Sequence, residues 1–158
     1  MKKKRAIFPG TFDPFTTGHF ALIERALKIV DEVVISIGTN DSKSTFFHLD
    51  DRLAMVKQLY RNNPAVSVCG YNNLTVEFAK QIEADFIIRG IRSVNDFEYE
   101  KNIADVNRML TGIETIILFT EPQYAHISSS IVRELFRFGH DVLQFVPSEI
   151  ADYIKQPD

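Results

Sequence analysis

The residues best suited to chemistry begin directly after the first apolar run. This run is followed by Pro9-Gly10-Thr11, and Gly18-His19 falls where a helix should begin. An accessible backbone that leads into a helix N-terminus often binds phosphate. On this motif alone an alternative is equally good: Thr16 or Thr17 caps the helix, and His19 is an exposed polar side chain.

Two arginines follow a later apolar run in the sequence "FIIRGIR". Arg89 comes directly after the run, Arg92 lies three residues on, and Gly90 between them lets the backbone come close. Two guanidinium groups at one strand end need an anionic partner, and their forked donors match phosphate oxygens. The alternative is a surface ion pair with Asp96 or Glu98.

Hydroxyls and a lysine stand in two further loops. Ser128, Ser129 and Ser130 begin a predicted helix, where hydroxyls beside open N–H groups are typical of an anion site. Simple helix capping is the alternative. Lys43, in "NDSKSTF", would by itself be only a solvated loop lysine.

Several common catalytic patterns are missing from the sequence. It contains no P-loop and no dinucleotide-binding glycine motif, and its four histidines lack the spacing of zinc ligands. A set of His, Lys, Arg, Ser and backbone amides suits phosphoryl or nucleotidyl transfer. This chemistry depends on positioning and charge neutralisation, and an attacking phosphate needs no protein base.

The elements that must position these residues alternate along the chain. Short apolar runs predict strands, and apolar residues at helical spacing predict the helices between them. The predicted strands are 5–8, 32–38, 65–71, 85–90 and 114–119, and the helices are 20–30, 49–59, 74–82, 99–110, 128–137 and a short one after Pro147. This alternation predicts a doubly wound α/β fold, a five-stranded parallel sheet with helices on both faces. Ligands bind such sheets at the carboxyl ends of the strands, near the point where the strand order reverses.

Length and composition set the broad class. A chain of 158 residues, 45% hydrophobic and 25% charged, is expected to form one globular domain over residues 1–158. The net charge of −3 argues against a nucleic-acid partner, and no apolar run is long enough to span a membrane. The single cysteine, Cys69, cannot form an internal disulfide, so we expect a cytoplasmic protein in which Cys69 packs in the core.

These motifs resemble those of a known family. Thr16-Thr17-Gly18-His19 resembles the T/H-x-G-H signature of the nucleotidylyltransferase superfamily, and "ISSSIVR" resembles its second signature. Together, "PGTFDPFTTGH", "RGIRSVNDFEYE" and the position of Lys43 resemble the bacterial phosphopantetheine adenylyltransferases, from Arg5 to about Ile154. The resemblance implies a Rossmann-like fold. It also implies in-line transfer of the adenylyl group of ATP to 4′-phosphopantetheine, with dephospho-coenzyme A and pyrophosphate as products.

The resemblance also assigns roles to residues. His19 would stabilise the transition state, with Lys43 and Arg92 as further catalytic groups. The implied ATP contacts are Thr11, Phe12, His19, Gly90, Ile91, Arg92, Glu100, Tyr124, Ala125, His126, Ile127, Ser128, Ser129 and Ser130. The implied acceptor contacts are Thr11, Lys43, Leu74, Thr75 and Arg89. Mg²⁺ would be carried by the ATP phosphates, without protein ligands.

The resemblance also has implications for the partners of this chain. The resemblance implies a homohexamer and coenzyme A as a feedback ligand. The sequence alone indicates only that some aromatic residues exceed the needs of one core, namely Phe46, Phe47, Phe136, Phe138 and Phe145.

One alternative function is a nucleotidylyltransferase that uses CTP or another acceptor. The other is a non-catalytic nucleotide-binding subunit, against which the intact set of His19, Lys43 and Arg92 argues.

Overall fold

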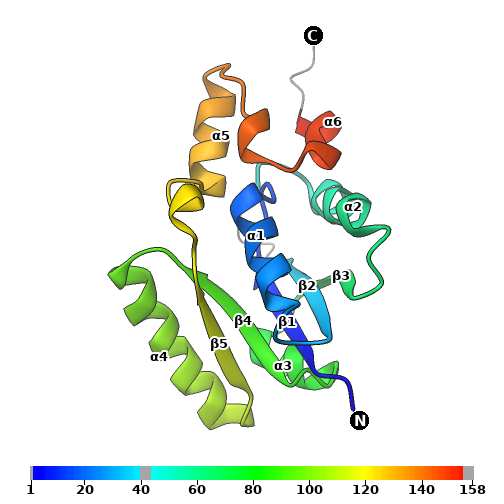
Figure 1. Ribbon diagram of the computed structural model, residues 1–158, viewed down its shortest axis with the longest axis vertical. Coiled ribbons are helices and arrows are strands. Elements are labelled where there is room, and N and C mark those ends of the chain that lie inside the picture. Colours follow the sequence, from blue (N-terminus) through cyan, green and yellow to red (C-terminus); the bar gives the residue numbers. More distant parts are fainter. Residues whose placement is uncertain (1, 40–43, 155–158) are drawn as a thin grey trace.

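The fold is built on one five-stranded parallel sheet. A computed structural model describes residues 2–39 and 44–154 of the chain. The strands are β1 (Arg5–Gly10), β2 (Glu32–Gly38), β3 (Val66–Tyr71), β4 (Phe86–Ile91) and β5 (Glu114–Phe119). They lie in the order β3-β2-β1-β4-β5, and every neighbouring pair is parallel (Figure 1). The predicted Rossmann-like α/β fold is confirmed.

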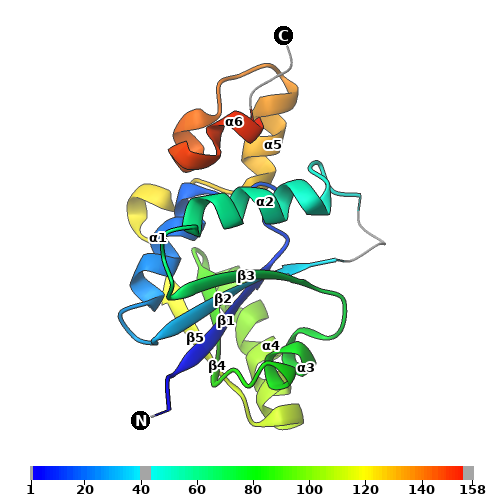
Figure 2. The same ribbon diagram turned by 90° about the vertical axis from the view of Figure 1, so that its right-hand side faces the viewer.

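Helices cover both faces of this sheet (Figures 1 and 2). They are α1 (Thr17–Ala26), α2 (Leu49–Tyr60), α3 (Thr75–Gln81), α4 (Val94–Thr111), α5 (Ser129–Arg137) and α6 (Ala151–Ile154). Three short 3₁₀ helices are η1 (Pro122–Tyr124), η2 (Leu143–Phe145) and η3 (Ser148–Ile150). Among the described residues no helix is long and apolar enough to cross a membrane. The first predicted strand was too short, because Pro9 and Gly10 still pair with β2.

Two apolar clusters hold the layers together. Side chains alternate between the faces of a strand, so Ala6 and Phe8 of β1 join a large cluster with α1 and α2, whereas Ile7 joins a smaller cluster with α3. Cys69 packs against the smaller cluster, and burial raises the pKa of its thiol. This agrees with the structural role predicted for Cys69, because a raised pKa keeps the thiol protonated.

Helix α4 has an unusual distribution of burial. Ser93 caps its start, and Gly112, in the left-handed region at φ 77°, ends it. Its apolar residues predicted the helix correctly, but they face solvent: Tyr99 is 64% exposed and Leu110 is 55% exposed. The buried residue of α4 is Glu100. Helix α4 therefore presents an apolar surface to solvent and a carboxylate to the interior.

Most of the aromatic residues predicted to exceed the core are packed within the chain instead. Phe46 makes edge-to-face contacts with Phe47 and Phe136. Phe47, Phe136 and Phe145 pack against the large cluster, whereas Phe138 is 77% exposed. The broader exposed apolar surface lies on α4, outside the aromatic residues that the sequence indicated.

Gly90 allows α1 to pack closely on β4. A Cβ atom at this position would lie 2.3 Å from Cδ1 of Leu22, which is buried on α1. The close approach expected at Gly90 is therefore the approach of α1 to β4. Gly90 also lines a cavity described below.

Gly90→Ala should destabilise the protein, because the added methyl group overpacks the contact between α1 and β4. We expect the free energy of unfolding, measured with urea, to fall by about 1–3 kcal/mol. Gly70→Ala on β3 is the control, since a Cβ there would make only ordinary contacts, 3.4 Å or longer. A Gly90→Ala protein as stable as the Gly70→Ala protein would contradict this packing role.

Candidate active site

Two adjoining cavities open at the carboxyl ends of β1 and β4, where the strand order reverses. The larger has a volume of about 1070 Å³ and the smaller about 330 Å³. Both are lined by Pro9, Gly10, Thr11, Arg89 and Glu100. These residues therefore form a shared wall, at which molecules bound in the two cavities would meet.

The structure brings most of the predicted site residues to these cavities. The predicted ATP contacts that line the smaller cavity are Thr11, Phe12, His19, Gly90, Arg92, Glu100, Tyr124, Ile127, Ser128 and Ser129. The predicted acceptor contacts that line the larger cavity are Thr11, Leu74, Thr75 and Arg89. Ile91, Ala125, His126 and Ser130 line neither cavity, and Ile91 is buried. Lys43 lies outside the described residues.

His19 belongs to a capping box at the start of α1. The Thr16 hydroxyl accepts the His19 N–H at 3.3 Å, and the Thr16 N–H donates to His19 Nδ1 at 3.0 Å. The alternative in which Thr16 caps the helix is therefore confirmed, but His19 is partly buried rather than exposed. Because Nδ1 accepts a backbone N–H, the proton of the neutral ring is on Nε2.

Aromatic rings surround the His19 imidazole. The rings of Phe12 and Phe15 have centroids 5.0 and 5.3 Å from it. Burial lowers the pKa of His19 to about 4, and the nearby cations Arg89 and Arg92 contribute to the same shift. At neutral pH His19 is thus an uncharged hydrogen-bond donor.

Phe12 contributes to this arrangement through a strained backbone. Its φ of 50° is uncommon for a residue other than glycine, and its ring occupies the space that a Cβ on Gly10 would need. The residue is 4% exposed. Phe12 lines the smaller cavity, and its ring packs against His19.

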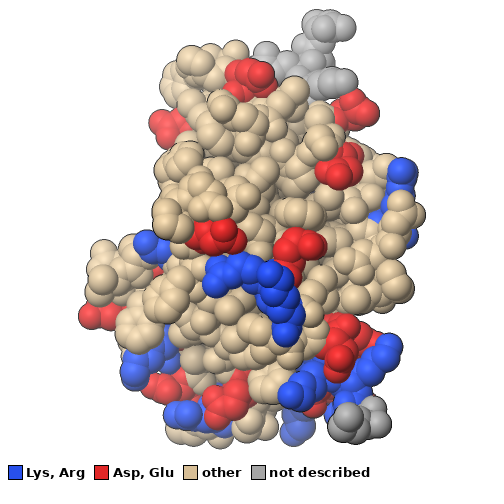
Figure 3. Space-filling model, in the orientation of Figure 1, with Lys and Arg blue, Asp and Glu red and all other residues tan. Residues whose placement is uncertain are grey.

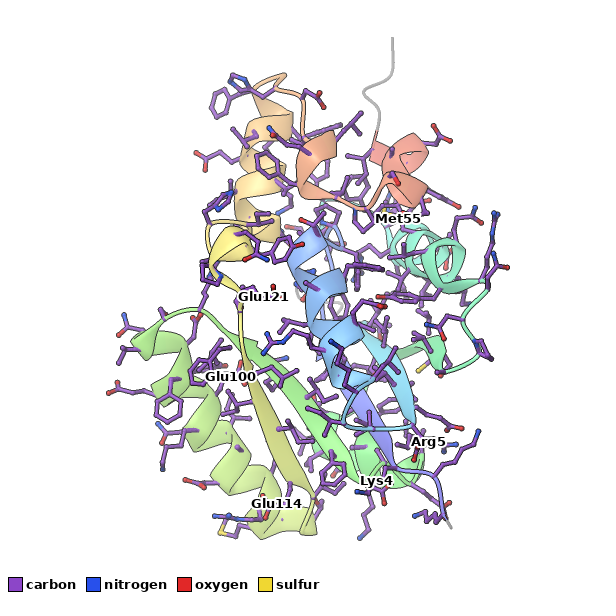
Figure 4. All side chains as sticks on the ribbon, in the orientation of Figure 1. Lys4, Arg5, Met55, Glu100, Glu114 and Glu121 are labelled. Carbon is purple, nitrogen blue, oxygen red and sulfur yellow. The ribbon has the colours of Figure 1, made fainter. Side chains whose placement is uncertain are left out.

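Arg89 is held in place by a buried carboxylate on α4. Its Nε and Nη2 donate to the two oxygens of Glu100 at 2.9 and 2.6 Å, and its Nη1 donates to the Pro9 carbonyl at 2.8 Å. Figure 4 labels Glu100 on α4. Neither Asp96 nor Glu98 is the partner of Arg89. Glu100, predicted to contact ATP, has both oxygens occupied and orients Arg89. The described residues use three of the five guanidinium N–H donors, which leaves two for an anion.

Arg92 has looser partners. Its Nε lies 3.9 Å from the Asp96 carboxylate, and its Nη1 donates to the Ile127 carbonyl at 3.3 Å. The ion pair with Asp96 that the sequence offered as an alternative therefore exists for Arg92, but it is long and partly exposed. Such a pair contributes little to stability, so Arg92 can turn toward an anion at low cost.

The three serines at the start of α5 are engaged in the fold. Ser128 Oγ accepts the Ile131 N–H at 3.2 Å as the helix cap. Ser129 Oγ donates to the Pro14 carbonyl at 2.8 Å, and Ser130 Oγ accepts from Arg133 at 3.2 Å. Ser129 therefore fastens α5 to the loop after β1, whereas Ser128 and Ser130 bond to groups of α5 itself. This differs from the open hydroxyl cradle expected from the sequence.

Three residues at this site were missed by sequence reasoning. Arg133, which donates to the Asp13 carbonyl at 2.8 Å, lines the smaller cavity and ends the quoted stretch "ISSSIVR". The Asp13 carboxylate accepts two backbone N–H groups of a distant loop. Arg52 of α2 donates to the Thr11 carbonyl at 2.7 Å. Asp13 and Arg52 carry no local signal, because their partners are far away in the sequence.

Comparison with known proteins decides the family. The cytidylyltransferase-like family model matches residues 7–135. A phosphopantetheine adenylyltransferase of Phocaeicola vulgatus is 58% identical over 144 residues, which are 91% of this chain and 95% of the relative. A protein of the same name from Bacteroides thetaiotaomicron is 56% identical with the same coverage, and one from Campylobacter hominis is 44% identical over 97% of each chain. The chain belongs to the cytidylyltransferase-like family and, within it, to the phosphopantetheine adenylyltransferase family.

Membership of the phosphopantetheine adenylyltransferase family confirms the resemblance drawn from the motifs. Because the relatives are named as adenylyltransferases, it also argues against the alternative of a non-catalytic binding subunit. A group-transfer site fits the two cavities and their shared wall.

The lowered pKa of His19 predicts how the stability of the ligand-free protein depends on pH. Between pH 6.5 and about 4 the unfolded chain binds the proton and the folded chain does not. The lowered pKa of His19 therefore contributes at most about 3 kcal/mol to the free energy of unfolding. This contribution is present above pH 6.5 and is lost as the pH falls toward 4. Urea unfolding of wild type and His19→Asn measures it. If the free energy of unfolding falls equally in the two proteins between pH 6.5 and 4, the lowered pKa of His19 is contradicted.

Proposed function

We propose that this protein transfers the adenylyl group of ATP to 4′-phosphopantetheine, giving dephospho-coenzyme A and pyrophosphate. The observation that carries the proposal is the wall shared by the two cavities, on which Thr11 and Arg89 lie. Two anionic substrates can meet there beside cationic and neutral donors. The names of the relatives supply the identity of the acceptor.

The smaller cavity suits the ATP phosphates. It is lined by His19 and Arg92, and by residues at the starts of two helices, Gly18 of α1 and Ser129 of α5. Helix N-termini favour negative charge. The space beside the Gly18 Cα is open to a ligand, because no protein atom fills it: a Cβ there would meet Thr16 and Tyr124 only at ordinary contact distances.

The larger cavity suits a long acceptor with both apolar and amide groups. Its wall combines the apolar side chains of Leu74 and Ile103 with the polar side chains of Thr75, Asn102 and Asn107. Arg89 stands where this cavity meets the smaller one, with two N–H donors left for an anion. The acceptor's phosphate would bind there, and its pantetheine arm would extend along α4.

The chemical step requires no proton transfer by the protein. An oxygen of the acceptor phosphate attacks the α-phosphorus of ATP, and the bond from this phosphorus to the bridging β-phosphate oxygen breaks to release pyrophosphate. Charge shifts on the α-phosphoryl oxygens as the reaction proceeds. A neutral Nε2–H of His19, already oriented by Thr16, can stabilise this charge without reorganisation.

Mg²⁺ is proposed to enter with the ATP phosphates. Among the described residues, no group of three or more His, Cys, Asp or Glu side chains could hold a metal ion. Mg²⁺ commonly keeps its waters and binds substrate phosphates, so it fits here as part of the substrate.

Assembly, regulation and location follow as further parts of the proposal. Coenzyme A shares the pantetheine arm of the acceptor and would compete for the larger cavity. A homohexamer would cover apolar residues that α4 exposes, such as Met109 and Leu110. The reducing cytoplasm suits a chain with one cysteine.

Pyrophosphate release measured with ATP or CTP and with several acceptors tests the proposed function. We expect release that requires both ATP and 4′-phosphopantetheine, with dephospho-coenzyme A as the second product. Turnover with CTP in place of ATP, or with a different acceptor, would favour the alternative transferase. No release under any combination would overturn the proposal.

His19→Ala should lower kcat by about 10²–10³, because it removes a donor that acts mainly in the transition state. The Kd for ATP should change far less, since only the difference between ground and transition states accelerates chemistry. Steady-state kinetics and calorimetry measure the two quantities, with thermal melting to show that the protein is folded. Near-normal kcat in a folded His19→Ala protein would rule out the catalytic role.

Arg89→Ala should weaken acceptor binding more than ATP binding, by about 2–5 kcal/mol. Arg92→Ala should show the opposite preference, because Arg92 lines only the smaller cavity. Arg89→Ala also leaves the Glu100 carboxylate buried without its partner, so Arg89→Ala/Glu100→Gln is the matched control. The KM values for the two substrates show which of them Arg89 binds. A raised KM for ATP alone in Arg89→Ala would reassign Arg89 to the nucleotide.

A further inference from the structure

Arg52 is a buried arginine that touches neither cavity. It lies on α2 and is 3% exposed. Its Nη1 donates to the Thr11 carbonyl at 2.7 Å, and its Nε donates to the Phe47 carbonyl at 3.2 Å. One guanidinium group therefore bridges the loop after β1 and the segment that leads into α2.

Asp13 reinforces the same junction from the other side. Its buried carboxylate accepts the Phe46 N–H at 2.7 Å and the Phe47 N–H at 2.8 Å. Three hydrogen bonds thus join the two segments, and in each of them residues 46–52 supply the donor and the loop after β1 supplies the acceptor. Thr11, on one segment, lines both cavities, and Thr45, on the other, lines the larger cavity. The junction therefore connects the shared wall to the acceptor side of the site.

Stability alone is a poor explanation for a charge at this position. Burying an arginine costs desolvation energy, and apolar residues of similar volume often replace buried charges without loss. Among the described residues, no carboxylate lies within ion-pair distance of Arg52, although Asp13 acts on it at longer range. The groups that Arg52 does bind are two backbone carbonyls.

The position of Arg52 also determines where one carbonyl dipole points. Arg52 lies on α2 and lines neither cavity, so its hydrogen bond holds the Thr11 carbonyl on the side of the loop that faces Arg52. A carbonyl oxygen directed into the site would repel the phosphates of both substrates. The hydrogen bond thus removes an unfavourable orientation of the loop at the point where the substrates meet.

We propose that Arg52 is a positioning residue for the adenylyl transfer: it fixes the backbone at Thr11 on the shared wall and couples it to the acceptor side through Phe47. The proposal rests on the proposed function. Its effect is expected in turnover rather than in binding, because a misplaced wall disturbs the alignment of the reacting groups. Displacements of about 1 Å can lower a rate roughly 10²-fold.

The test compares Arg52→Met with Arg5→Met, which is matched in chemistry but distant from the site. Arg5 also donates to a backbone carbonyl, that of Ile82, and pairs with Glu32 at the opposite end of β1. Figure 4 labels Arg5 at this end of the molecule, where Figure 3 shows side chains of both charges gathered. Urea unfolding and steady-state kinetics are measured for both variants, well below their melting temperatures.

We expect Arg52→Met to lower kcat by about 10- to 100-fold, while the KM values for ATP and 4′-phosphopantetheine change less than about threefold. Arg5→Met should lose stability but keep the wild-type kcat. Arg52→Lys should recover part of the lost kcat, because it keeps the charge and can reach one carbonyl but cannot span both. If Arg52→Met does not fold, Arg52→Lys decides the question by the same measurements.

Several outcomes would overturn the proposal. A wild-type kcat in folded Arg52→Met or in Arg52→Lys would show that Arg52 is only structural. Equal losses of kcat in Arg52→Met and Arg5→Met would show a general effect of lowered stability. Absence of turnover in the wild type would overturn the proposed function and this inference together, whereas an active wild type with an unaffected Arg52 variant overturns this inference alone.

Discussion

The structure depends on how the end of β1 and the loop that follows it satisfy their backbone carbonyls. A loop in the interior has no neighbouring strand to pair with, yet its polar groups must find partners. Arg89 of β4 donates to the Pro9 carbonyl, Arg52 of α2 to that of Thr11, and Arg133 of α5 to that of Asp13. Three elements that are distant in sequence thus converge on alternate residues of one short segment, and their positions are set by it.

This solution also supplies the electrostatics of the site. Arg89 and Arg133 use some of their donors on the loop and still line the smaller cavity. Because Glu100 binds two further donors of Arg89 from a buried position, the guanidinium group is fixed before any ligand arrives. Donors that are held in place need no reorganisation when charge develops. The hydrogen bonds that complete the fold and those that orient the cations of the candidate site are therefore largely the same.

The sequence predicted the fold well because its signals are local. Apolar runs and helical spacing predicted every strand of the sheet and every α-helix around it. The polar residues after β1 and β4 indicated where the candidate site lies. The contacts between those residues could not be predicted in the same way. The sequence did not indicate that Glu100 binds Arg89 or that the serine hydroxyls of α5 bind groups of the fold, because residue type indicates capacity but not partner. Asp13 and Arg52 act across 34 and 41 positions, so their roles depend on the tertiary structure.

His19 shows why two interpretations of one motif need not exclude each other. The sequence offered a choice between a helix cap at Thr16 and a catalytic histidine. In the structure the cap is what prepares the histidine: the Thr16 N–H binds Nδ1, which places the ring proton on Nε2. Phe12 and Phe15 keep the ring desolvated, and burial lowers its pKa to about 4, so the donor stays neutral. A local interaction that begins a helix thus also determines which atom of His19 can donate to a phosphate.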